Sequence, residues 1–393
     1  MRIILLVLLL SLLCPIYSQK NKDMDAIQNI ITNIQQKYAP DIRTSLFDIH
    51  FESDKKNKVI LSGETNLPEA KEDLIKEIKK AGYQLTDNIN VLPGNEFGKN
   101  KFGVITLSVT SLRTKPEHSA ELATQALLGS RIILLKKSEG WVLVQTPDKY
   151  IAWIEPESYQ KMDLAQLNEL SSSKRIIITK EFSFCYSEKN ISSAPVSDLA
   201  AGNLLKELDR DNEYVKVEFP DRRTGYVPTG SCEVYSEWLK NRQPTEENII
   251  KTAKRFLGIP YIWGGTSSKL MDCSGFTRTV FLLNGIYLPR DASQQANVGI
   301  PVDIQKDFDS IRPGDLMFFG KKATANSKEK ITHVGIYLGD GDFIHESGMV
   351  KINSFNKSKE NFSNMRLDQF VSARRIINSL DMNGVKLLKN IEY

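Results

Sequence analysis

One segment of the sequence occurs twice, first in 141–154 and again in 214–227. The two copies, WVLVQTPDKYIAWI and YVKVEFPDRRTGYV, both contain an aromatic residue, then Val-x-Val and then Pro-Asp. Gly129 and Gly202 precede that aromatic residue at equal spacing, so the repeated frame is longer than the matching letters. Short alternating strands joined by a Pro-Asp turn are typical of small antiparallel barrels. The repeat therefore predicts two consecutive barrels of one design.

The two predicted barrels occupy residues 103–165 and 170–240, and they resemble bacterial SH3 domains. The repeated aromatic residues are expected in the two cores, and they are Trp141, Trp153, Tyr214 and Tyr226. The copies differ in one loop, which contains EHSAEL in the first copy and CYSEKN in the second. This divergence indicates different work for the two copies, or a spacer role for the second.

Residues 20–100 alternate helical and strand patterns and are predicted to form a separate small α/β domain. The predicted elements are a helix in 22–36, strands in 47–53 and 58–63, a helix in 66–82 and a strand in 88–94. This α-β-β-α-β order resembles the BON domain, a small bacterial envelope module.

The N-terminal segment 1–18, MRIILLVLLLSLLCPIYS, is typical of an export signal. It contains one basic residue, a short leucine-rich stretch and a polar end, and it is too short to span a bilayer. We expect cleavage near Ser18 and an exported protein, periplasmic or extracellular. No membrane span is expected, because no later stretch approaches ~18 consecutive apolar residues. The alternative is a lipoprotein attached at Cys14, although Leu12 and Leu13 are larger than the residues that usually precede such a site.

The length and charge of the chain limit its organisation and its partners. A chain of 393 residues is more than one hydrophobic core usually serves, so several domains are expected. The 52 basic and 48 acidic residues give a formal net charge of +4, with no run of like charges. Such a balance does not favour nucleic acid, and we expect no nucleic-acid partner.

Three cysteines remain once the predicted export signal is removed: Cys185, Cys232 and Cys273. In an oxidising compartment the first two either form a disulfide or stay as separate buried thiols. Cys273 is left over in both cases. A leftover thiol in an exported protein is a candidate reactive group.

Cys273 stands at the predicted start of a helix. The stretch MDCSGFTRTVFLLNG (271–285) has apolar residues at helical spacing and a glycine at its end. Unpaired backbone N–H groups and the helix dipole at this position favour the thiolate, which is the nucleophilic form. The same N–H groups can stabilise an oxyanion. The pattern therefore predicts that Cys273 is a nucleophile.

A thiol nucleophile needs a base, and KITHVGIYLGDGDFIHESG (330–348) offers two histidines. The segment is typical of a hairpin, with His333 and His345 on its opposite arms. One imidazole can take the thiol proton while the other orients it. The alternative is a zinc ion held by Cys273 and both histidines. We expect no metal, because no CxxC or HxxxH spacing accompanies these residues.

Four motifs resemble the NlpC/P60 family of cysteine peptidases: GIPYIWGGTSSKLMDCSGF, LPRDASQQ, RPGDLMFF and THVGIYLGDGDFIHESG. The predicted catalytic domain spans 244–393. The resemblance implies an α+β papain-like core, in which a helix carrying the thiol packs against an antiparallel sheet carrying the histidines. It also implies that Cys273 is the nucleophile, His333 the base and His345 the orienting residue. Tyr261 matches a family tyrosine whose hydroxyl lies near the oxyanion.

Two SH3-type domains before such a core resemble the γ-D-glutamyl-L-diamino acid endopeptidases, which trim cell-wall peptides during recycling. In those enzymes an aspartate and a serine beside the cysteine bind the free amino group of L-alanine, and Asp272 and Ser274 match them. Their first SH3 domain contributes a glutamate and a tyrosine, for which Glu121 and Tyr150 are the candidates. The implied partners are peptidoglycan peptides (muropeptides), and no cofactor is implied.

The predicted function is therefore hydrolysis of the γ-D-Glu–L-diamino acid bond in peptides that begin with a free L-Ala. Two other functions stay open on sequence grounds. The first is hydrolysis of intact peptidoglycan, with the SH3 domains as wall anchors, in which case the alanine nitrogen is an uncharged amide. The second is a non-catalytic wall-binding protein. The intact set of Cys273, His333 and His345 argues against the second.

Overall fold

The structure is a computed structural model that describes residues 24–53, 57–304 and 308–391. The predicted export signal, with Cys14 and Ser18, lies outside the described residues. No helix in the described part of the chain is both long enough and apolar enough to cross a membrane. The chain divides into two compact units, the first reaching Gly98 and including Lys149–Ile151, the second containing the rest.

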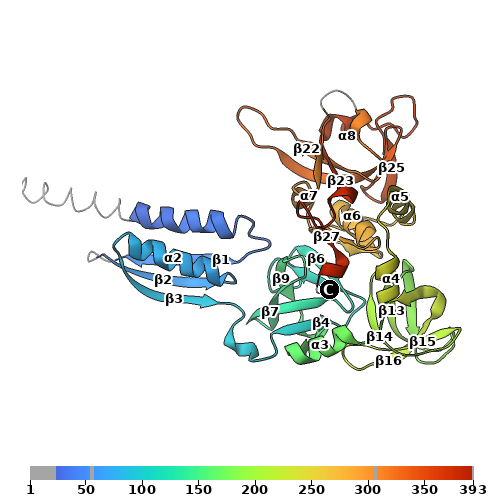
Figure 1. Ribbon diagram of the computed structural model, residues 1–393, viewed down its shortest axis with the longest axis horizontal. Coiled ribbons are helices and arrows are strands. Elements are labelled where there is room, and N and C mark those ends of the chain that lie inside the picture. The colour runs from blue at the N-terminus through green and yellow to red at the C-terminus, as the bar shows by residue number, and fades with distance from the viewer. Residues whose placement is uncertain (1–23, 54–56, 305–307, 392–393) are drawn as a thin grey trace, which may run out of the picture. The chain divides into compact units, whose positions relative to one another are not determined.

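The N-terminal unit contains the predicted α-β-β-α-β order of elements (Figure 1). A helix over residues 24–38 is followed by β1 (Phe47–Ser53), β2 (Lys58–Thr65), α2 (Pro68–Lys80) and β3 (Gln84–Val91). The sheet order is β1-β2-β3, with β2 antiparallel to β1 and parallel to β3. Both helices bury one apolar stripe on this sheet, as the helical spacing of their isoleucines and leucines requires. The likeness to a BON domain stays a prediction.

Two seven-stranded sheets begin the second unit, and the internal repeat of the sequence is a repeat of their strand order. The first has β4 (Phe102–Ile105), β5 (Val109–Arg113), β6 (Leu122–Leu127), β7 (Arg131–Ser138), β8 (Trp141–Gln145), β9 (Ile151–Ile154) and β10 (Tyr159–Met162). The second has β11 (Arg175–Ile178), β12 (Phe182–Tyr186), β13 (Pro195–Ala200), β14 (Leu204–Arg210), β15 (Tyr214–Glu218), β16 (Thr224–Pro228) and β17 (Cys232–Val234). Their orders, β10-β4-β7-β8-β9-β5-β6 and β17-β11-β14-β15-β16-β12-β13, match strand for strand.

The aromatic residues of the repeat do not all fill the cores, which corrects the prediction made for them. Trp141 is buried, but Trp153, Tyr214 and Tyr226 are only half-buried. Because side chains alternate between the two faces of a strand, each tyrosine of the second copy faces away from the core that its neighbouring valines fill. These core valines are Val215, Val217 and Val227, and all are fully buried.

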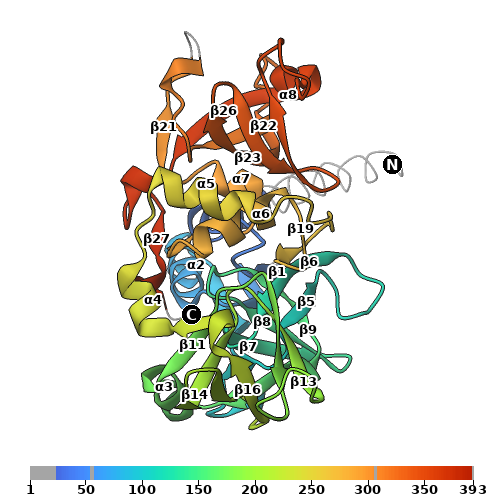
Figure 2. The same cartoon turned by 90° about the vertical axis from the view of Figure 1, so that its right-hand side faces the viewer.

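Helices and a six-stranded antiparallel sheet complete the second unit (Figures 1 and 2). The helices are α3 (Leu164–Ser172), α4 (Tyr235–Asn241), α5 (Glu246–Lys254), α6 (Cys273–Leu282), α7 (Ala292–Gln295) and α8 (Asn364–Gln369). The sheet consists, in order, of β21 (Ile300–Val302), β26 (Phe370–Arg375), β22 (Leu316–Lys321), β23 (Lys330–Gly339), β24 (Asp342–Glu346) and β25 (Val350–Ser354). Two short ladders join β18 (Thr266–Ser267) to β19 (Leu270–Met271), and β20 (Ile286–Tyr287) to β27 (Lys386–Leu387).

Helices α5, α6 and α7 pack against strand β23 of this sheet. Thr245 caps α5 by accepting a hydrogen bond from the Asn248 N–H at 3.2 Å, as a threonine before an apolar helix does. Phe276 and Val280 of α6 are fully buried and share one core with Val334 of β23. The predicted arrangement of one thiol-bearing helix on an antiparallel sheet is therefore present.

The described cysteines are all free thiols, so the disulfide alternative for Cys185 and Cys232 is wrong. Both are buried in the second seven-stranded sheet and its core. Burial raises the pKa of Cys185 to about 12 and that of Cys232 to about 11, which keeps both thiols unreactive.

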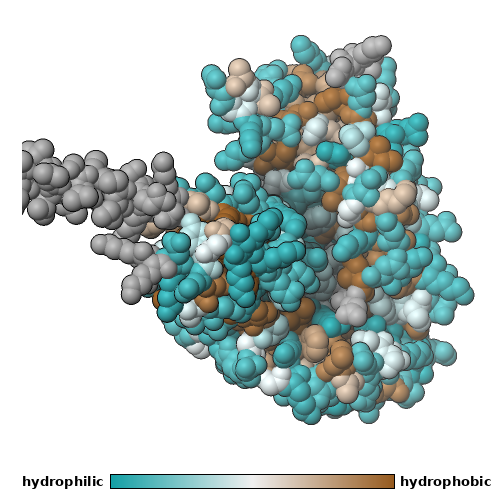
Figure 3. Space-filling model, turned by 60° about the vertical axis from the view of Figure 1, so that its left-hand side comes forward, coloured by the Kyte–Doolittle hydropathy of each residue, from teal (hydrophilic) through white to brown (hydrophobic). Residues whose placement is uncertain are grey.

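On the face shown in Figure 3 the surface is mostly hydrophilic, with hydrophobic residues in small scattered groups.

Candidate active site

Cys273 is the first residue of α6, and the local sequence explains why the helix begins there. The carboxylate of Asp272 accepts a hydrogen bond from the Gly275 N–H at 2.8 Å and thereby caps the helix. A Cβ at Gly275 would lie 1.9 Å from the carbonyl oxygen of Gly265, so only glycine lets these two backbones approach. The thiol is held at the helix N-terminus with 8% of the Cys273 residue exposed.

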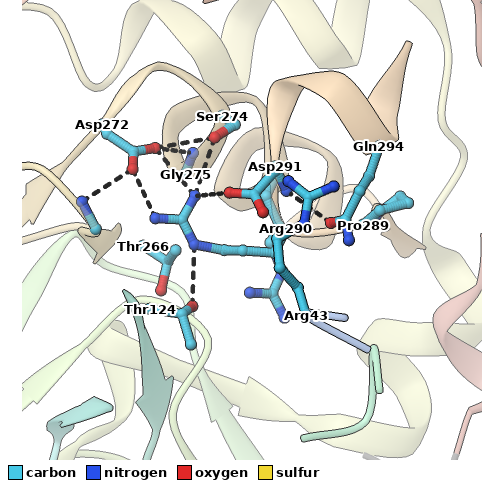
Figure 4. Close-up of polar contacts among 12 residues, drawn as sticks. Arg43, Thr124, Thr266, Asp272, Ser274, Gly275, Pro289, Arg290, Asp291 and Gln294 are labelled. Carbon is cyan, nitrogen blue, oxygen red and sulfur yellow. Dashed lines mark hydrogen bonds and ion pairs between the residues drawn. The ribbon is translucent and has the colours of Figure 1, made fainter. Parts of the chain in front are cut away.

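Arg290 binds both neighbours of the cysteine (Figure 4). Its Nη2 lies 2.6 Å from Asp272 Oδ2, and its Nη1 lies 2.9 Å from Ser274 Oγ. Its Nε donates to Thr124 Oγ1 of β6 at 3.0 Å, which connects this network to the first seven-stranded sheet. Arg290 is 2% exposed, so the guanidinium and the carboxylate form a buried pair whose removal on one side would leave an uncompensated charge.

The Asp272 carboxylate has little capacity left for a further partner. Besides Arg290, Oδ2 accepts from the Gly264 N–H at 3.0 Å, and Oδ1 accepts from Gly275 and from Ser274 Oγ. Sequence reasoning placed Asp272 and Ser274 beside the thiol, and they are there. It assigned no role to Arg290, although this residue lies inside the quoted motif LPRDASQQ.

The two histidines are in direct contact, and a third residue fixes their protons. His333 Nε2 lies 2.7 Å from His345 Nδ1, and His345 Nε2 lies 2.8 Å from Asn353 Oδ1. The Asn353 amide donates through Nδ2 to the Asn361 carbonyl at 3.1 Å, which turns its oxygen toward His345. An oxygen acceptor requires a proton on His345 Nε2, so His345 Nδ1 accepts from His333 Nε2. His333 Nδ1 then carries no proton and is free to act as a base.

Burial keeps both imidazoles neutral. Burial, and next the positive charge of Arg366, hold the pKa of His333 well below its usual value. Burial also lowers the pKa of His345 to about 4, against the hydrogen bond to Asn353, which raises it. The proton positions inferred from the hydrogen bonds are therefore those of the resting site.

The thiol is also neutral at rest, which differs from the thiolate expected from the helix N-terminus. Burial, and next the negative charge of Asp272, raise the pKa of Cys273 to about 12. The backbone N–H groups of Val334 and Ser274 point at the sulfur and oppose this shift, as does the charge of Arg290. Val334 follows His333 directly, so this contact brings the thiol beside the strand that carries His333. The resting site pairs a thiol with an unprotonated imidazole.

Tyr261 lies close enough to Cys273 for a charge on the sulfur to shift the pKa of its phenol. Burial, and next the negative charge of a Cys273 thiolate, raise the pKa of the Tyr261 phenol, so it stays a hydrogen-bond donor. Its backbone is fixed by a bond from its N–H to the Gly348 carbonyl at 3.0 Å. A protonated phenol near the sulfur is suited to an oxyanion.

Glu121 and Tyr150, the candidates from the first barrel, lie in different surroundings. Glu121 is exposed, and its Oε1 accepts from Nε1 of Trp263 at 2.6 Å. Trp263 closely follows Tyr261 in the chain and is 61% exposed, so Glu121 stands beside the segment that carries the phenol. Tyr150 is buried, with 8% exposed, in the connection between β8 and β9.

Sequence reasoning missed four residues of this region: Asn353, Arg290, Glu346 and Arg366. Asn353 is next to His345 only through the pairing of β24 with β25, which no local pattern reveals. Glu346 is fully buried, and neither of its carboxylate oxygens has a hydrogen-bond partner among the described residues. Burial, and next the charge of Asp272, raise the pKa of Glu346 to about 7.

The zinc alternative does not fit this geometry. The facing nitrogens of His333 and His345 bond each other, and the outer nitrogen of His345 is bonded to Asn353. Within the described ranges no group of three His, Cys, Asp or Glu side chains is placed to hold a metal ion.

Two protein-family models match parts of this chain. The NlpC/P60 family matches residues 258–371, and a family described as the bacterial dipeptidyl-peptidase SH3 domain matches residues 112–158. The latter match lies within the first seven-stranded sheet, so the second sheet, despite its equal strand order, stays a predicted SH3 domain.

Two relatives are each more than 30% identical to this chain. A gamma-D-glutamyl-L-lysine dipeptidyl-peptidase of Bacillus cereus is 32% identical over 236 residues, which cover 57% of this chain and 67% of the relative. A protein of the same name from Bacillus subtilis is 31% identical, over 57% of this chain and 72% of that relative. The crystal structure of an NlpC/P60 family protein from Bacillus cereus superposes with a TM-score of 0.60 at 25% identity, over 70% of this chain and 99% of that one.

Proposed function

The chain belongs to the NlpC/P60 family of cysteine peptidases, and from this we propose that it hydrolyses the bond between γ-D-Glu and the L-diamino acid of peptidoglycan peptides, preferring a free N-terminal L-Ala. The observation that carries the proposal is the hydrogen-bond chain from Asn353 through His345 to His333, which leaves His333 Nδ1 unprotonated. The names of two relatives, each above 30% identity, support the choice of bond. The predicted export signal fits a substrate derived from the cell wall.

In the proposed reaction the neutral thiol and the neutral imidazole act together. His333 Nδ1 takes the Cys273 proton while Sγ forms a bond to the γ-carbonyl carbon of D-Glu. The Tyr261 hydroxyl and the backbone N–H groups of the first turn of α6 donate to the resulting oxyanion. Because both partners start neutral, the thiolate and the imidazolium arise only as a pair, and each offsets the charge of the other in a buried site.

The tetrahedral intermediate then collapses. The C–N bond breaks, and His333 Nδ1 returns its proton to the leaving amine of the diamino acid. The thioester on Cys273 is attacked by water, whose proton passes to the same nitrogen. The C–S bond breaks, L-Ala-D-Glu leaves, and the thiol is re-formed with the proton from His333.

In the proposed reaction Glu121 binds the free amine of L-Ala, and Asp272 and Ser274 contribute to the same binding site. The Asp272 oxygens already accept from Arg290 and from two backbone N–H groups, so Asp272 contributes its charge more than a free oxygen. Glu121 is exposed, and Trp263 occupies one of its oxygens. Its second oxygen is the better acceptor for an ammonium group.

One comparison of peptides tests the proposed function. The purified protein is offered L-Ala-γ-D-Glu-L-Lys, its N-acetylated form and insoluble peptidoglycan, and the products are identified by mass. We expect release of L-Lys from the free peptide and a loss of at least about tenfold in kcat/KM on acetylation. Equal cleavage of both peptides would refute the amine preference, and cleavage of the intact wall alone would point to the alternative hydrolase.

The nucleophile and the amine site have variants of their own. Cys273→Ala should abolish hydrolysis and leave any binding of wall fragments intact, whereas a non-catalytic binding protein would show no difference in any function. Glu121→Gln should reduce kcat/KM for the free peptide and leave the acetylated peptide unaffected. Glu117→Gln is the matched control, because Glu117 is an exposed residue of the same loop.

A further inference from the structure

Arg366 of α8 is a half-buried cation that has no counter-ion among the described residues. Its Nη1 donates to Gln369 Oε1 and its Nη2 to Ser347 Oγ, both at 3.2 Å and both to neutral acceptors. Its Nε is buried and has no hydrogen-bond partner among the described residues, and no carboxylate of that part of the chain forms an ion pair with it.

Three other arginines of this unit, each with a mostly buried side chain, have a carboxylate. Arg278 lies 3.2 Å from Asp148, Arg290 lies 2.6 Å from Asp272, and Arg375 lies 2.8 Å from Asp315. Transfer of a cation out of water is costly unless a negative group accompanies it. Arg366 bears this cost in the free protein, since burial lowers its pKa and leaves the charge poorly solvated. A ligand that brought a carboxylate would relieve it.

Only the ring of Phe319 separates Arg366 from His333 among the described residues. Its guanidinium carbon is 5.7 Å from the centroid of the Phe319 ring, and that ring is 5.6 Å from the ring of His333. Its charge acts on His333 and on His345, and the charge of a Cys273 thiolate acts on it in turn. An anion bound by Arg366 would therefore lie close enough to interact with the charges that arise on His333 and Cys273.

The proposed substrate offers a carboxylate at this place. A peptide linked through the γ-carboxyl of D-Glu keeps the α-carboxylate of that residue free, on the acyl side of the scissile bond. The diamino acid, when it is the last residue, has a second free carboxylate on the leaving side. Both lie a few bonds from the carbonyl that Cys273 attacks.

Resting on the proposed function, we propose that Arg366 binds a substrate carboxylate adjacent to the scissile bond and so selects for it. The guanidinium keeps Ser347 and Gln369 as neutral supports, and the carboxylate accepts from the second N–H of Nη1 and of Nη2 in a two-point contact. A lysine at this position would supply the charge without that fork, so Arg366→Lys should retain only part of the selectivity.

Three peptides identify the bound carboxylate. The first is L-Ala-γ-D-Glu-L-Lys, the second has D-isoglutamine in place of D-Glu, and the third ends in a C-terminal amide. Arg366→Gln should lower kcat/KM on the first by about 10- to 100-fold, as loss of a charged hydrogen bond does. The fall in kcat/KM caused by Arg366→Gln should vanish on the amide peptide that lacks the bound carboxylate. That peptide shows whether Arg366 binds the carboxylate of D-Glu or that of the diamino acid. An equal deficit on all three peptides would overturn the proposal.

Alkylation of Cys273 tests the anion site without any peptide substrate. The rates with iodoacetate, which is an anion, and iodoacetamide, which is neutral, are measured at Cys273 by peptide mass mapping. The ratio of the iodoacetate rate to the iodoacetamide rate should fall several-fold in Arg366→Gln and remain high in Arg366→Lys. Arg374→Gln is the control, because this β26 arginine influences none of the catalytic pKa values.

The two experiments separate the proposals. A fall in the iodoacetate preference with no cleavage of any peptide would refute the proposed function and leave the anion site standing. Cleavage of the peptides with an unchanged alkylation ratio and a uniform deficit would refute the anion site alone. Thermal unfolding of each variant guards against simple misfolding, and Arg366→Lys provides a second variant if Arg366→Gln does not fold.

Discussion

The direction of one amide side chain decides which nitrogen of His333 carries a proton. Asn353 turns its oxygen to His345 because its nitrogen is held by the Asn361 carbonyl, and the consequence passes through His345 to His333. The side chains of this hydrogen-bond chain are all uncharged at rest. The site therefore depends on hydrogen-bond geometry, and not on a carboxylate, to keep His333 Nδ1 unprotonated.

Loss of Asn353 should affect turnover more than binding. Asn353→Ala removes the acceptor that fixes the His345 proton, so we expect kcat to fall about 10- to 100-fold with little change in KM, within the range of a general-base contribution. Asn353→Asp retains an oxygen acceptor and should retain more activity than the alanine variant. Asn326→Ala, in an exposed loop, is the control. An increase in KM alone would show that Asn353 acts on the substrate instead.

The acid limb of the pH profile follows from His333. Its pKa is held below the usual value of 6.5, so the base stays unprotonated into acidic solution. We expect the acid limb of kcat/KM to have its midpoint below 6.5, the usual value for a histidine. The buried carboxyl of Glu346, with a pKa of about 7, is a second group that can titrate in this range. The pH profile of Glu346→Gln distinguishes it from His333, because a limb near pH 7 that disappears in this variant belongs to the carboxyl. An acid limb at pH 6.5 or above in both proteins would contradict a buried neutral base.

At the scale of elements, the start of α6 depends on a close approach of two backbones. Gly275→Ala would place a Cβ 1.9 Å from the Gly265 carbonyl oxygen, so the helix start must shift and the thiol with it. We expect the free energy of unfolding to fall by about 1 to 3 kcal/mol. We expect kcat to fall by a larger fraction of its value than the free energy of unfolding does. Gly230→Ala, with no atom within 4 Å of the added Cβ, should change neither. Urea unfolding and steady-state kinetics measure both quantities.

Elements with local signals were predictable from the sequence, and long-range partners were not. The apolar spacing after Cys273 predicted α6, and the alternation around His333 and His345 predicted the hairpin of β23 and β24, because both patterns arise from neighbouring residues. Arg290 reaches Thr124 across 166 positions of sequence, and Asn353 reaches His345 through strand pairing. Such contacts depend on the assembled fold, so no window of sequence contains them.

At the scale of the whole molecule, Glu346 should make stability depend on pH. The folded state raises its pKa to about 7 through burial and the charge of Asp272, with Lys351 opposing. An acid whose pKa is raised by folding retains its proton where the unfolded chain has lost it, so stability falls as pH rises from about 4.5 to above 7. We expect Glu346 to lower the free energy of unfolding by about 1 to 3 kcal/mol over this range.

A variant isolates this contribution. Glu346→Gln should equal the parent near pH 4.5 and exceed it in stability at pH 8, as measured by urea unfolding. Glu329→Gln, at an exposed position, should follow the parent at both values. If Glu346→Gln were less stable than the parent by the same amount at both pH values, a polar contact of the carboxyl, and not its ionisation, would explain the difference.

Arg290 has a consequence for how such proteins can be recombined. Its guanidinium donates hydrogen bonds to Asp272 and Ser274, on either side of Cys273, and to Thr124 of the first sheet. A catalytic cassette cut out at residue 244 would take Arg290 along and leave Thr124 behind, with a buried N–H lacking its acceptor. Transplanting this peptidase onto another scaffold therefore requires a hydroxyl at the same place. The unit that keeps this network complete is the first seven-stranded sheet together with the peptidase.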